Sequence, residues 1–87
     1  MNGDKVQYAI EIKPQAIKDG KKIPRDVLRR IIDKIEQLSD DLHGEVKRLT
    51  HFTPEYRLRV GNYRVLFEVE HDQVVIYRIK HRRNAYK

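Results

Sequence analysis

The chain has 87 residues, and its 19 lysines and arginines outnumber its 13 aspartates and glutamates, which gives a net charge of +6. No cysteine is present, which excludes a disulfide framework and thiolate chemistry and fits a reducing cytoplasm. No apolar run approaches the length of about 18 residues that a membrane span needs, and we expect no signal peptide. We therefore expect one cytoplasmic domain, residues 1–87, with no membrane contact.

The positive charge lies in the second half of the sequence. Residues 1–46 contain nine basic and nine acidic side chains, whereas residues 47–87 contain ten basic and four acidic ones. A surplus of this kind favours nucleic acid or an acidic protein as the partner.

The first half of the sequence predicts a strand followed by two helices. Apolar residues alternate from Lys5 to Ile12, as in a strand with one buried face. Pro14 suits the first position of a short helix that runs to about Lys18 and ends at Gly20, and Pro24 opens a second helix. The second helix carries an apolar stripe at helical spacing, which predicts its core face: Val27, Leu28, Ile31, Ile32, Ile35 and Leu38.

The second half predicts a small antiparallel sheet. After a loop at 40–44, residues 46–49 fit a short strand or an irregular edge. Two-residue turns at Gly61-Asn62 and His71-Asp72 then join three strands, Tyr56–Val60, Tyr63–Glu70 and Gln73–Lys80.

The two turns fix the register of this sheet. Val60 opposes Tyr63 and Arg59 opposes Arg64, and across the second turn the predicted pairs are Glu70 with Gln73, Phe67 with Ile76, Leu66 with Tyr77 and Arg64 with Ile79. Opposed residues share a face. One face is therefore apolar and forms the core: Tyr56, Leu58, Val60, Tyr63, Val65, Phe67, Val69, Val74 and Ile76. The opposite face is basic: Arg57, Arg59, Arg64, Leu66, Glu68, Tyr77, Ile79 and His81.

Two basic residues conflict with this register, because Arg78 and Lys80 fall on the core face. Either they lie at the end of the sheet with their charged groups reaching water, or the second turn is longer than two residues.

The basic face and the C-terminal tail suit phosphoryl chemistry on RNA without a metal. Arginines bind phosphate oxygens in pairs of hydrogen bonds, and directly opposed arginines repel each other unless an anion lies between them. The four histidines lack metal-ligand spacing and no glycine-rich phosphate loop occurs, so we expect no metal and no small-molecule cofactor. His81 titrates in the range that a general base needs, and Tyr86 offers a hydroxyl and an aromatic ring.

The order of these elements, with the segments YRLRVGNYRVLFEVE, VVIYRI and HRRNAYK, resembles the RelE/ParE superfamily of bacterial toxins from about Lys5 to Tyr86. It is most similar to the RelE-like branch, whose members cleave mRNA on the ribosome. The resemblance implies an α+β fold: an N-terminal strand, a helical hairpin, and an antiparallel sheet of three or four strands with the helices on one face.

The resemblance also implies roles for single residues. Arg64 matches the strand arginine that contacts the scissile phosphate, Arg82 or Arg83 matches the arginine at the leaving group, and Tyr86 matches the tyrosine that orients or deprotonates the substrate. Arg57 and Arg59 stand where the best-known member has lysines, and an arginine cannot act as a base.

Some relatives use a histidine near the C-terminus, in the neighbourhood of His81. We therefore expect the catalytic residues to be Arg64, His81, Arg82 and Tyr86, and the substrate-binding residues to be Arg57, Arg59 and Arg83.

The resemblance implies that the chain is the toxin of a type II toxin-antitoxin system, an endoribonuclease that acts on mRNA in the ribosomal A site and is neutralised by a cognate antitoxin. Two other functions stay open. One is a ParE-like inhibitor of DNA gyrase on the same fold, and the other is a basic binding module without catalysis.

Overall fold

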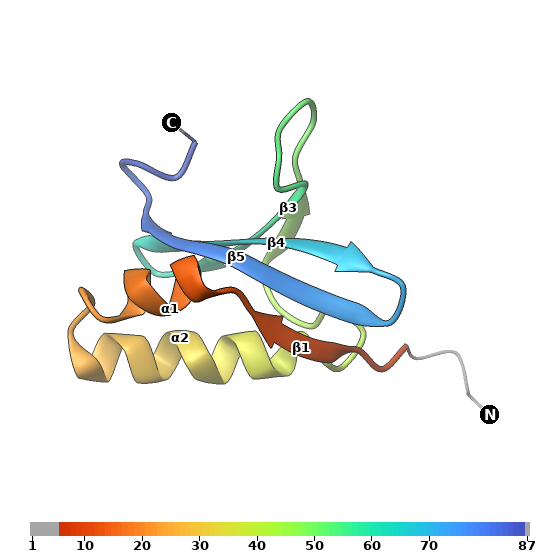
Figure 1. Ribbon diagram of the computed structural model, residues 1–87, viewed down its shortest axis with the longest axis horizontal. Coiled ribbons are helices and arrows are strands. Elements are labelled where there is room, and N and C mark those ends of the chain that lie inside the picture. The colour runs from red at the N-terminus through yellow and green to blue at the C-terminus, as the bar shows by residue number, and fades with distance from the viewer. Residues whose placement is uncertain (1–5, 87) are drawn as a thin grey trace.

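A computed structural model describes residues 6–86 of the chain and shows two helices and five strands. In chain order they are β1 (Ala9–Ile12), α1 (Pro14–Gly20), α2 (Arg25–Gln37), β2 (Val46–Arg48), β3 (Tyr56–Val60), β4 (Tyr63–Glu70) and β5 (Gln73–His81). The predicted order is confirmed (Figure 1). The first strand begins at Ala9, four residues after the predicted start at Lys5, which lies outside the described residues.

All five strands form one sheet in the order β1-β5-β4-β3-β2. The pairs among β2, β3, β4 and β5 are antiparallel, whereas β1 runs parallel to β5, with Ala9 beside Gln73. The α+β fold is therefore confirmed, but the sheet is mixed and larger than the predicted antiparallel sheet of three or four strands. The difference arises because β1 pairs with a strand more than 60 residues away, which local sequence patterns do not reveal.

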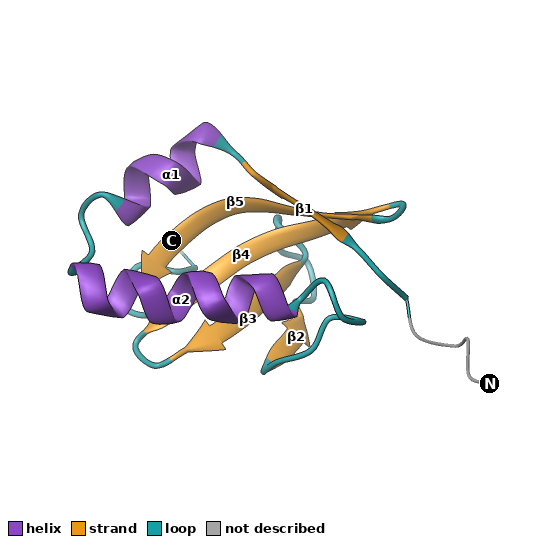
Figure 2. Cartoon of the chain, turned by 90° about the horizontal axis from the view of Figure 1, so that it is seen from below, coloured by secondary structure: helices purple, strands orange, loops and turns teal. Residues whose placement is uncertain are grey.

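The core lies between one face of this sheet and α2 (Figure 2). Ile31, Ile35 and Leu38 of the predicted helical stripe are at most 1% exposed. They pack in one cluster with the predicted apolar face of the sheet, which includes the fully buried Val65 and Phe67. The other face of the sheet, called the open face below, is not covered by either helix (Figure 1).

The first hairpin has the predicted register. Val60 pairs with Tyr63 and Arg59 with Arg64, and Gly61 adopts the positive φ of +56° that its turn requires. Leu58 and Val60 are buried, so the basic residues between them point to the open face.

The second hairpin has its predicted turn but changes register inside the strands. Phe67 pairs with Ile76, whereas Leu66 pairs with Arg78, so β5 contains one extra residue, Tyr77, in a β-bulge. The predicted pairs Leu66 with Tyr77 and Arg64 with Ile79 are therefore wrong.

Beyond the bulge, every side chain of β5 lies on the opposite face from the one predicted. Ile79 pairs with Val65 and is 5% exposed in the core, and Lys80 pairs with Arg64 on the open face. Arg78 and Lys80 therefore leave the core because of the bulge, and neither of the two explanations offered from the sequence is needed.

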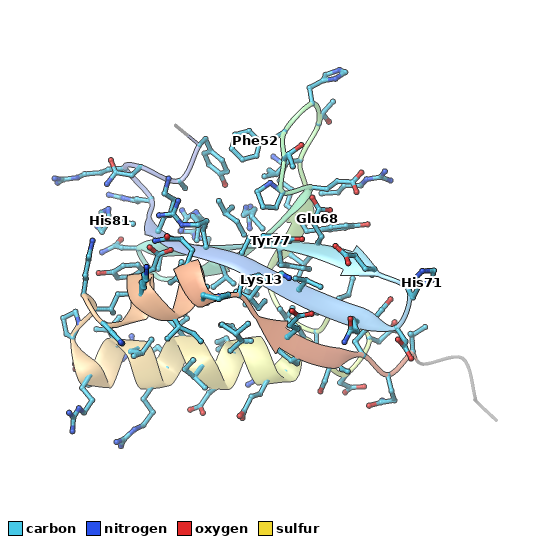
Figure 3. All side chains as sticks on the ribbon, viewed as in Figure 1. Lys13, Phe52, Glu68, His71, Tyr77 and His81 are labelled. Atoms are coloured by element: carbon cyan, nitrogen blue, oxygen red, sulfur yellow. The ribbon has the colours of Figure 1, made fainter. Side chains whose placement is uncertain are left out.

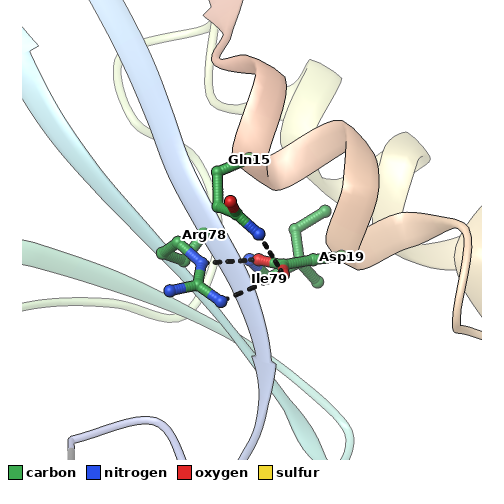
Figure 4. Close-up of polar contacts among 4 residues, drawn as sticks. All are labelled: Gln15, Asp19, Arg78 and Ile79. Carbon is green, nitrogen blue, oxygen red and sulfur yellow. Dashed lines mark hydrogen bonds and ion pairs between the residues drawn. The ribbon is translucent and has the colours of Figure 1, made fainter.

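The short helix α1 is fixed to β5 by a buried carboxylate, Asp19, which is 9% exposed (Figure 4). The pairing of β1 with β5 ends at Ile76, and the next outward-facing N–H of β5, that of Ile79, donates to Asp19 Oδ2 at 2.9 Å. Arg78 adds bonds from Nε (2.8 Å) and Nη2 (3.1 Å), and Gln15 adds one at 3.4 Å. Burial alone would raise the pKa of Asp19, but these donors together hold it below its usual value.

Two irregular segments rise from the open face, on the side of the sheet away from α2 (Figure 1). One is the loop 49–55 between β2 and β3, and the other is the C-terminal tail after β5. Before β2, Gly44 has φ +135°, and a Cβ there would lie 2.8 Å from Leu58 Cδ1, so only glycine fits. This close approach brings β2, with Lys47 and Arg48, against β3.

Candidate nucleic-acid interface

A groove of about 490 Å³ lies on the open face between the loop 49–55 and the C-terminal tail. Its lining includes four cationic side chains and no carboxylate: Lys47, Arg48, Leu49, Thr50, Phe52, Arg57, Arg64 and Tyr86. The groove below refers to this site. Three predicted site residues, Arg57, Arg64 and Tyr86, therefore come together.

Arg64 is held at the groove by its own turn. Its Nη1 donates to the carbonyl oxygens of Tyr63 (2.9 Å) and Gly61 (3.0 Å). Its Nε and Nη2 hydrogens have no acceptor within residues 6–86. The side chain is half-buried, so its position is fixed while two donor groups are left for a phosphate.

Arg57 reaches the groove from the neighbouring strand, β3. Its Nη1 donates to the carbonyl oxygen of Glu45 at 3.0 Å, which ties the side chain to the segment before β2. Lys47 is the direct partner of Arg57 across the two strands. Two like charges side by side destabilise a sheet, and a bound anion would remove this cost.

Arg64 lies between Arg59 and Lys80 in the sheet, so three cationic residues follow one row across β3, β4 and β5. Arg59 belongs to this row but not to the groove. Its side chain lies 3.9 Å from the Glu45 carboxylate and lines a separate hollow toward α2.

The wall of the groove on the side of β2 is set by Arg48. Its Nη2 and Nε bind one oxygen of Glu55, at 2.6 and 2.9 Å, and this hydrogen-bonded carboxylate raises the pKa of Arg48. The pair closes the base of the loop 49–55 and keeps Arg48 beside the groove.

Tyr86 stands at the mouth of the groove on the tail. Its neighbour Ala85 is 1% exposed and anchors the tail, while Tyr86 itself is 46% exposed. Phe52 at the loop meets the Tyr86 ring edge to face, with centroids 5.4 Å apart and planes at 82°. Figure 3 shows Phe52 between the loop and the tail.

His81 does not lie at the groove. It pairs with Tyr63, whose ring contacts the imidazole edge to face at 5.4 Å, and Tyr63 packs against the core cluster. The prediction that His81 shares the face of Arg64 is wrong, because the bulge at Tyr77 reverses the end of β5. Its Nδ1 accepts the backbone N–H of Arg83 at 3.3 Å, so the ring holds the start of the tail.

The two tail arginines are exposed and neither lines the groove. The backbone N–H of Arg82 donates to the carbonyl oxygen of Asn62 at 2.7 Å, which fixes the backbone of this part of the tail on the first hairpin turn. Their guanidinium groups make no ion pair within residues 6–86.

Sequence reasoning missed several groove residues, namely Lys47, Arg48, Thr50 and Phe52, and it missed Lys80 on the open face. The segment 46–49 was recognised as a short strand, and pairing it with the strand from Tyr56 would have placed Lys47 opposite Arg57. No local signal marks Phe52, because its contact with Tyr86 joins residues 34 positions apart.

The described residues contain no group of three or more His, Cys, Asp or Glu side chains arranged to bind a metal ion. Neither α1 nor α2 has the length and apolar character that a membrane-crossing helix needs.

Comparison with known proteins places the chain among toxins. Residues 10–86 match the model of the family described as ParE toxin of type II toxin-antitoxin system, parDE. Toxin RelE3 of Methanocaldococcus jannaschii is 35% identical over 75 residues, which cover 80% of this chain and 85% of that protein.

Solved structures agree in fold and in sequence. The RelB-RelE antitoxin-toxin complex from Methanococcus jannaschii contains a chain that is 31% identical with a TM-score of 0.71, and the match covers 84% of this chain and 91% of that one. The complex RelBE2 from Mycobacterium tuberculosis contains a chain that is 27% identical with a TM-score of 0.76, over 87% of this chain and 99% of that one. The family match spans nearly all the described residues, and the chain therefore belongs to the RelE/ParE superfamily as the toxin of a type II toxin-antitoxin system.

Proposed function

We propose that this toxin is an endoribonuclease that cuts mRNA in the ribosomal A site and is neutralised by a cognate antitoxin. The observation that supports this proposal most strongly is the meeting of Arg57, Arg64 and Tyr86 in one groove without a carboxylate. Two similar solved chains are described as parts of antitoxin-toxin complexes, which supports a protein partner of the same kind here.

The proposed reaction is an internal transfer at phosphorus. The 2′-oxygen attacks the adjacent phosphate, the bond from phosphorus to the 5′-oxygen breaks, and the products carry a 2′,3′-cyclic phosphate and a 5′-hydroxyl. The 2′-hydroxyl loses a proton to a base and the departing 5′-oxygen gains one. Negative charge grows on the non-bridging oxygens, where donors act most strongly on the rate.

The residues of the groove divide these tasks. The two free donor groups of Arg64 suit the non-bridging oxygens, and Arg57 adds a second guanidinium from the next strand. The Tyr86 hydroxyl at the mouth takes part in proton transfer. The exposed guanidinium of Arg82 or Arg83 stabilises the leaving oxygen when RNA lies against the tail. In this scheme the cations of the chain serve in place of a metal ion.

The test is primer extension on an mRNA that is being translated, with wild-type protein and the Arg64→Ala variant. Wild type should cut, and loss of this donor should slow the reaction about 10²-fold or more. Arg29→Ala, at an exposed position of α2, has the same charge change and should cut like wild type. Equal rates for wild type and Arg64→Ala would refute the assignment of the groove.

Metal independence has its own test, because ribosomes require magnesium. A single phosphorothioate at the scissile position replaces one non-bridging oxygen with sulfur. If a metal ion bound that oxygen, manganese or cadmium would restore the lost rate. Arginine donors predict no such rescue.

Inhibition of DNA gyrase is the second candidate function, since the matching family model carries the name ParE. A supercoiling assay separates the two. If wild-type protein leaves translated mRNA intact while gyrase supercoiling falls, the gyrase function replaces the ribonuclease proposal.

A further inference from the structure

A second hollow of about 640 Å³ lies on the open face, and the loop 49–55 contributes Thr53 and Pro54 to its wall. It is lined by Lys13, Pro14, Gln15, Thr53, Pro54, Glu68, Glu70, Tyr77 and Arg78. This site, called the acidic pocket below, shares no lining residue with the groove. Figure 3 labels Lys13, Glu68 and Tyr77 around it.

Two carboxylates in this pocket have neutral partners only. Glu68 Oε2 accepts the backbone N–H of Glu55 at 2.9 Å, and Glu70 Oε2 accepts the Tyr77 hydroxyl at 3.3 Å. No cationic side chain among residues 6–86 forms an ion pair with either carboxylate.

The two cationic residues in the lining are already paired with other acids. Lys13 forms an ion pair with Glu11 at 3.2 Å, and Arg78 is bound by Asp19 at 2.8 Å. The pocket therefore presents two uncompensated negative charges on a face whose other residues are mostly basic.

The rest of the pocket is apolar and aromatic. Pro14 and Pro54 form part of its wall, and the Tyr77 ring is half-exposed because the bulge turns it out of the core. Lys13 Nζ lies 5.9 Å from the centroid of the Tyr77 ring, so this ring already attracts one cation. Burial and the nearby Glu70 raise the pKa of Tyr77, which keeps its hydroxyl protonated as a donor.

We propose that the acidic pocket binds an arginine side chain of the antitoxin, with the guanidinium between the Glu68 and Glu70 carboxylates and against the Tyr77 ring. A guanidinium pairs with carboxylates, stacks on aromatic rings and loses less hydration than an ammonium, and each of these properties matches one part of this pocket. RNA is a poor occupant, because its phosphates would meet two carboxylates. The identity of the partner depends on the function proposed above, whereas the chemistry of the pocket does not.

Occupation of the pocket would also be felt in the groove. The backbone N–H of Glu55 binds Glu68 in the pocket, and the carboxylate of Glu55 binds Arg48 at the groove. A guanidinium that draws Glu68 toward itself competes with the first bond. The loop that carries Phe52 is therefore linked to both sites.

The first test uses a defined probe and the free protein. N-acetyl-arginine methylamide is titrated into isotope-labelled protein and followed by two-dimensional NMR, beside N-acetyl-citrulline methylamide, which has nearly the same shape without the charge. We expect saturable shifts at Glu68, Glu70 and Tyr77 with the arginine probe and at least tenfold weaker binding of citrulline. Equal binding of both probes, or no shifts at these residues, would overturn the proposal.

Variants assign this binding to the two carboxylates. Glu68→Gln with Glu70→Gln keeps both acceptor oxygens and removes both charges, and should weaken the arginine probe about tenfold. The matched control is Asp33→Asn with Glu36→Gln, which removes two charges from exposed positions of α2 and should bind like wild type. Unchanged affinity in the pocket variant would refute the assignment.

The second test uses the protein encoded beside this chain, purified with it as a complex. The pocket variant should dissociate from it at least tenfold faster than the control variant, while both variants cut mRNA like wild type. If the complex forms and the two variants dissociate equally, the pocket proposal fails and the toxin-antitoxin pairing stands. If wild type forms no complex and cuts no mRNA, the proposed function fails, and the arginine probe still decides the chemistry of the pocket.

Discussion

Replacement of Asp19 by alanine should destabilise the fold more than any other loss of a single charge. The carboxylate is 9% exposed and accepts the Ile79 N–H, two donors of Arg78 and one of Gln15. A buried N–H left without an acceptor costs about 1–3 kcal/mol. Arg78 is 36% exposed, so water replaces much of its bond and it adds at most about 1 kcal/mol. The free energy of unfolding should therefore fall by about 2–4 kcal/mol.

This loss is large for a chain of 87 residues, whose total stability is on the order of 4–13 kcal/mol. The melting temperature should drop by roughly 10–30 °C. Urea unfolding followed by circular dichroism measures the change. Asp33→Ala, at an exposed position of α2, is the control and should cost less than about 0.5 kcal/mol. If both variants cost the same, Asp19 does not hold α1 to β5.

The same carboxylate predicts a dependence on pH. The folded-state pKa of Asp19 is lowered, so its contribution to stability is complete above the unfolded value of about 3.9 and is lost as the pH falls through the folded value. Asp19→Asn cannot show this loss. The difference in unfolding free energy between wild type and Asp19→Asn should be constant near neutral pH and shrink below about pH 4, and a constant difference down to pH 2 would contradict the assignment.

Three further predictions concern the groove and are read out by single-turnover cleavage of mRNA. Tyr86→Phe keeps the ring beside Phe52 and removes the hydroxyl, so the rate should fall about 10²-fold with unchanged affinity for RNA; an unchanged rate would exclude the hydroxyl from proton transfer. Phe52→Leu removes an edge-to-face contact worth about 0.5–1.5 kcal/mol and should cost about threefold to tenfold, but nothing further in a Tyr86→Leu background, where an additional loss would show that Phe52 acts without Tyr86. His81→Gln should keep the rate within about threefold, because the imidazole lies against Tyr63; a hundredfold loss would restore the role predicted for it from the sequence.

The sequence was sufficient where the determining contacts are local. Alternation in β3 and β4, with Gly61 at a position that needs positive φ, predicted the pairing of Arg59 with Arg64 and thereby the faces of both strands. The helical stripe of α2 predicted the buried Ile31 and Ile35 in the same way.

The sequence was insufficient where one residue changes the register. The bulge at Tyr77 follows from no turn signal, yet it moves Ile79 into the core and Lys80 beside Arg64. The sign of the bulge was present in the sequence as two cationic residues, Arg78 and Lys80, on a predicted core face. A one-residue insertion corrects both at once, which makes it a more economical explanation than treating each charge separately.

Non-local contacts account for the remaining differences. Lys47 and Arg48 reach the groove because β2 pairs with β3 across the loop 49–55, and Asp19 meets Ile79 across 60 positions of sequence. Periodicity cannot show such contacts, so the sequence indicated a basic face but neither the shape of the groove nor the carboxylate that fixes α1.

The bulge also explains how one open face holds two sites of opposite charge. It places Lys80 beside Arg64 in the row of cations and turns Tyr77 outward next to Glu70. Between the groove and the acidic pocket, Glu55 binds Arg48 with its carboxylate and Glu68 with its N–H. RNA is attracted to the groove and repelled from the pocket, whereas a protein can offer acids to the former and an arginine to the latter. The arrangement of charge therefore favours a protein over RNA as the ligand that occupies both sites, which is the discrimination that an antitoxin needs to bind the toxin in the presence of ribosomes.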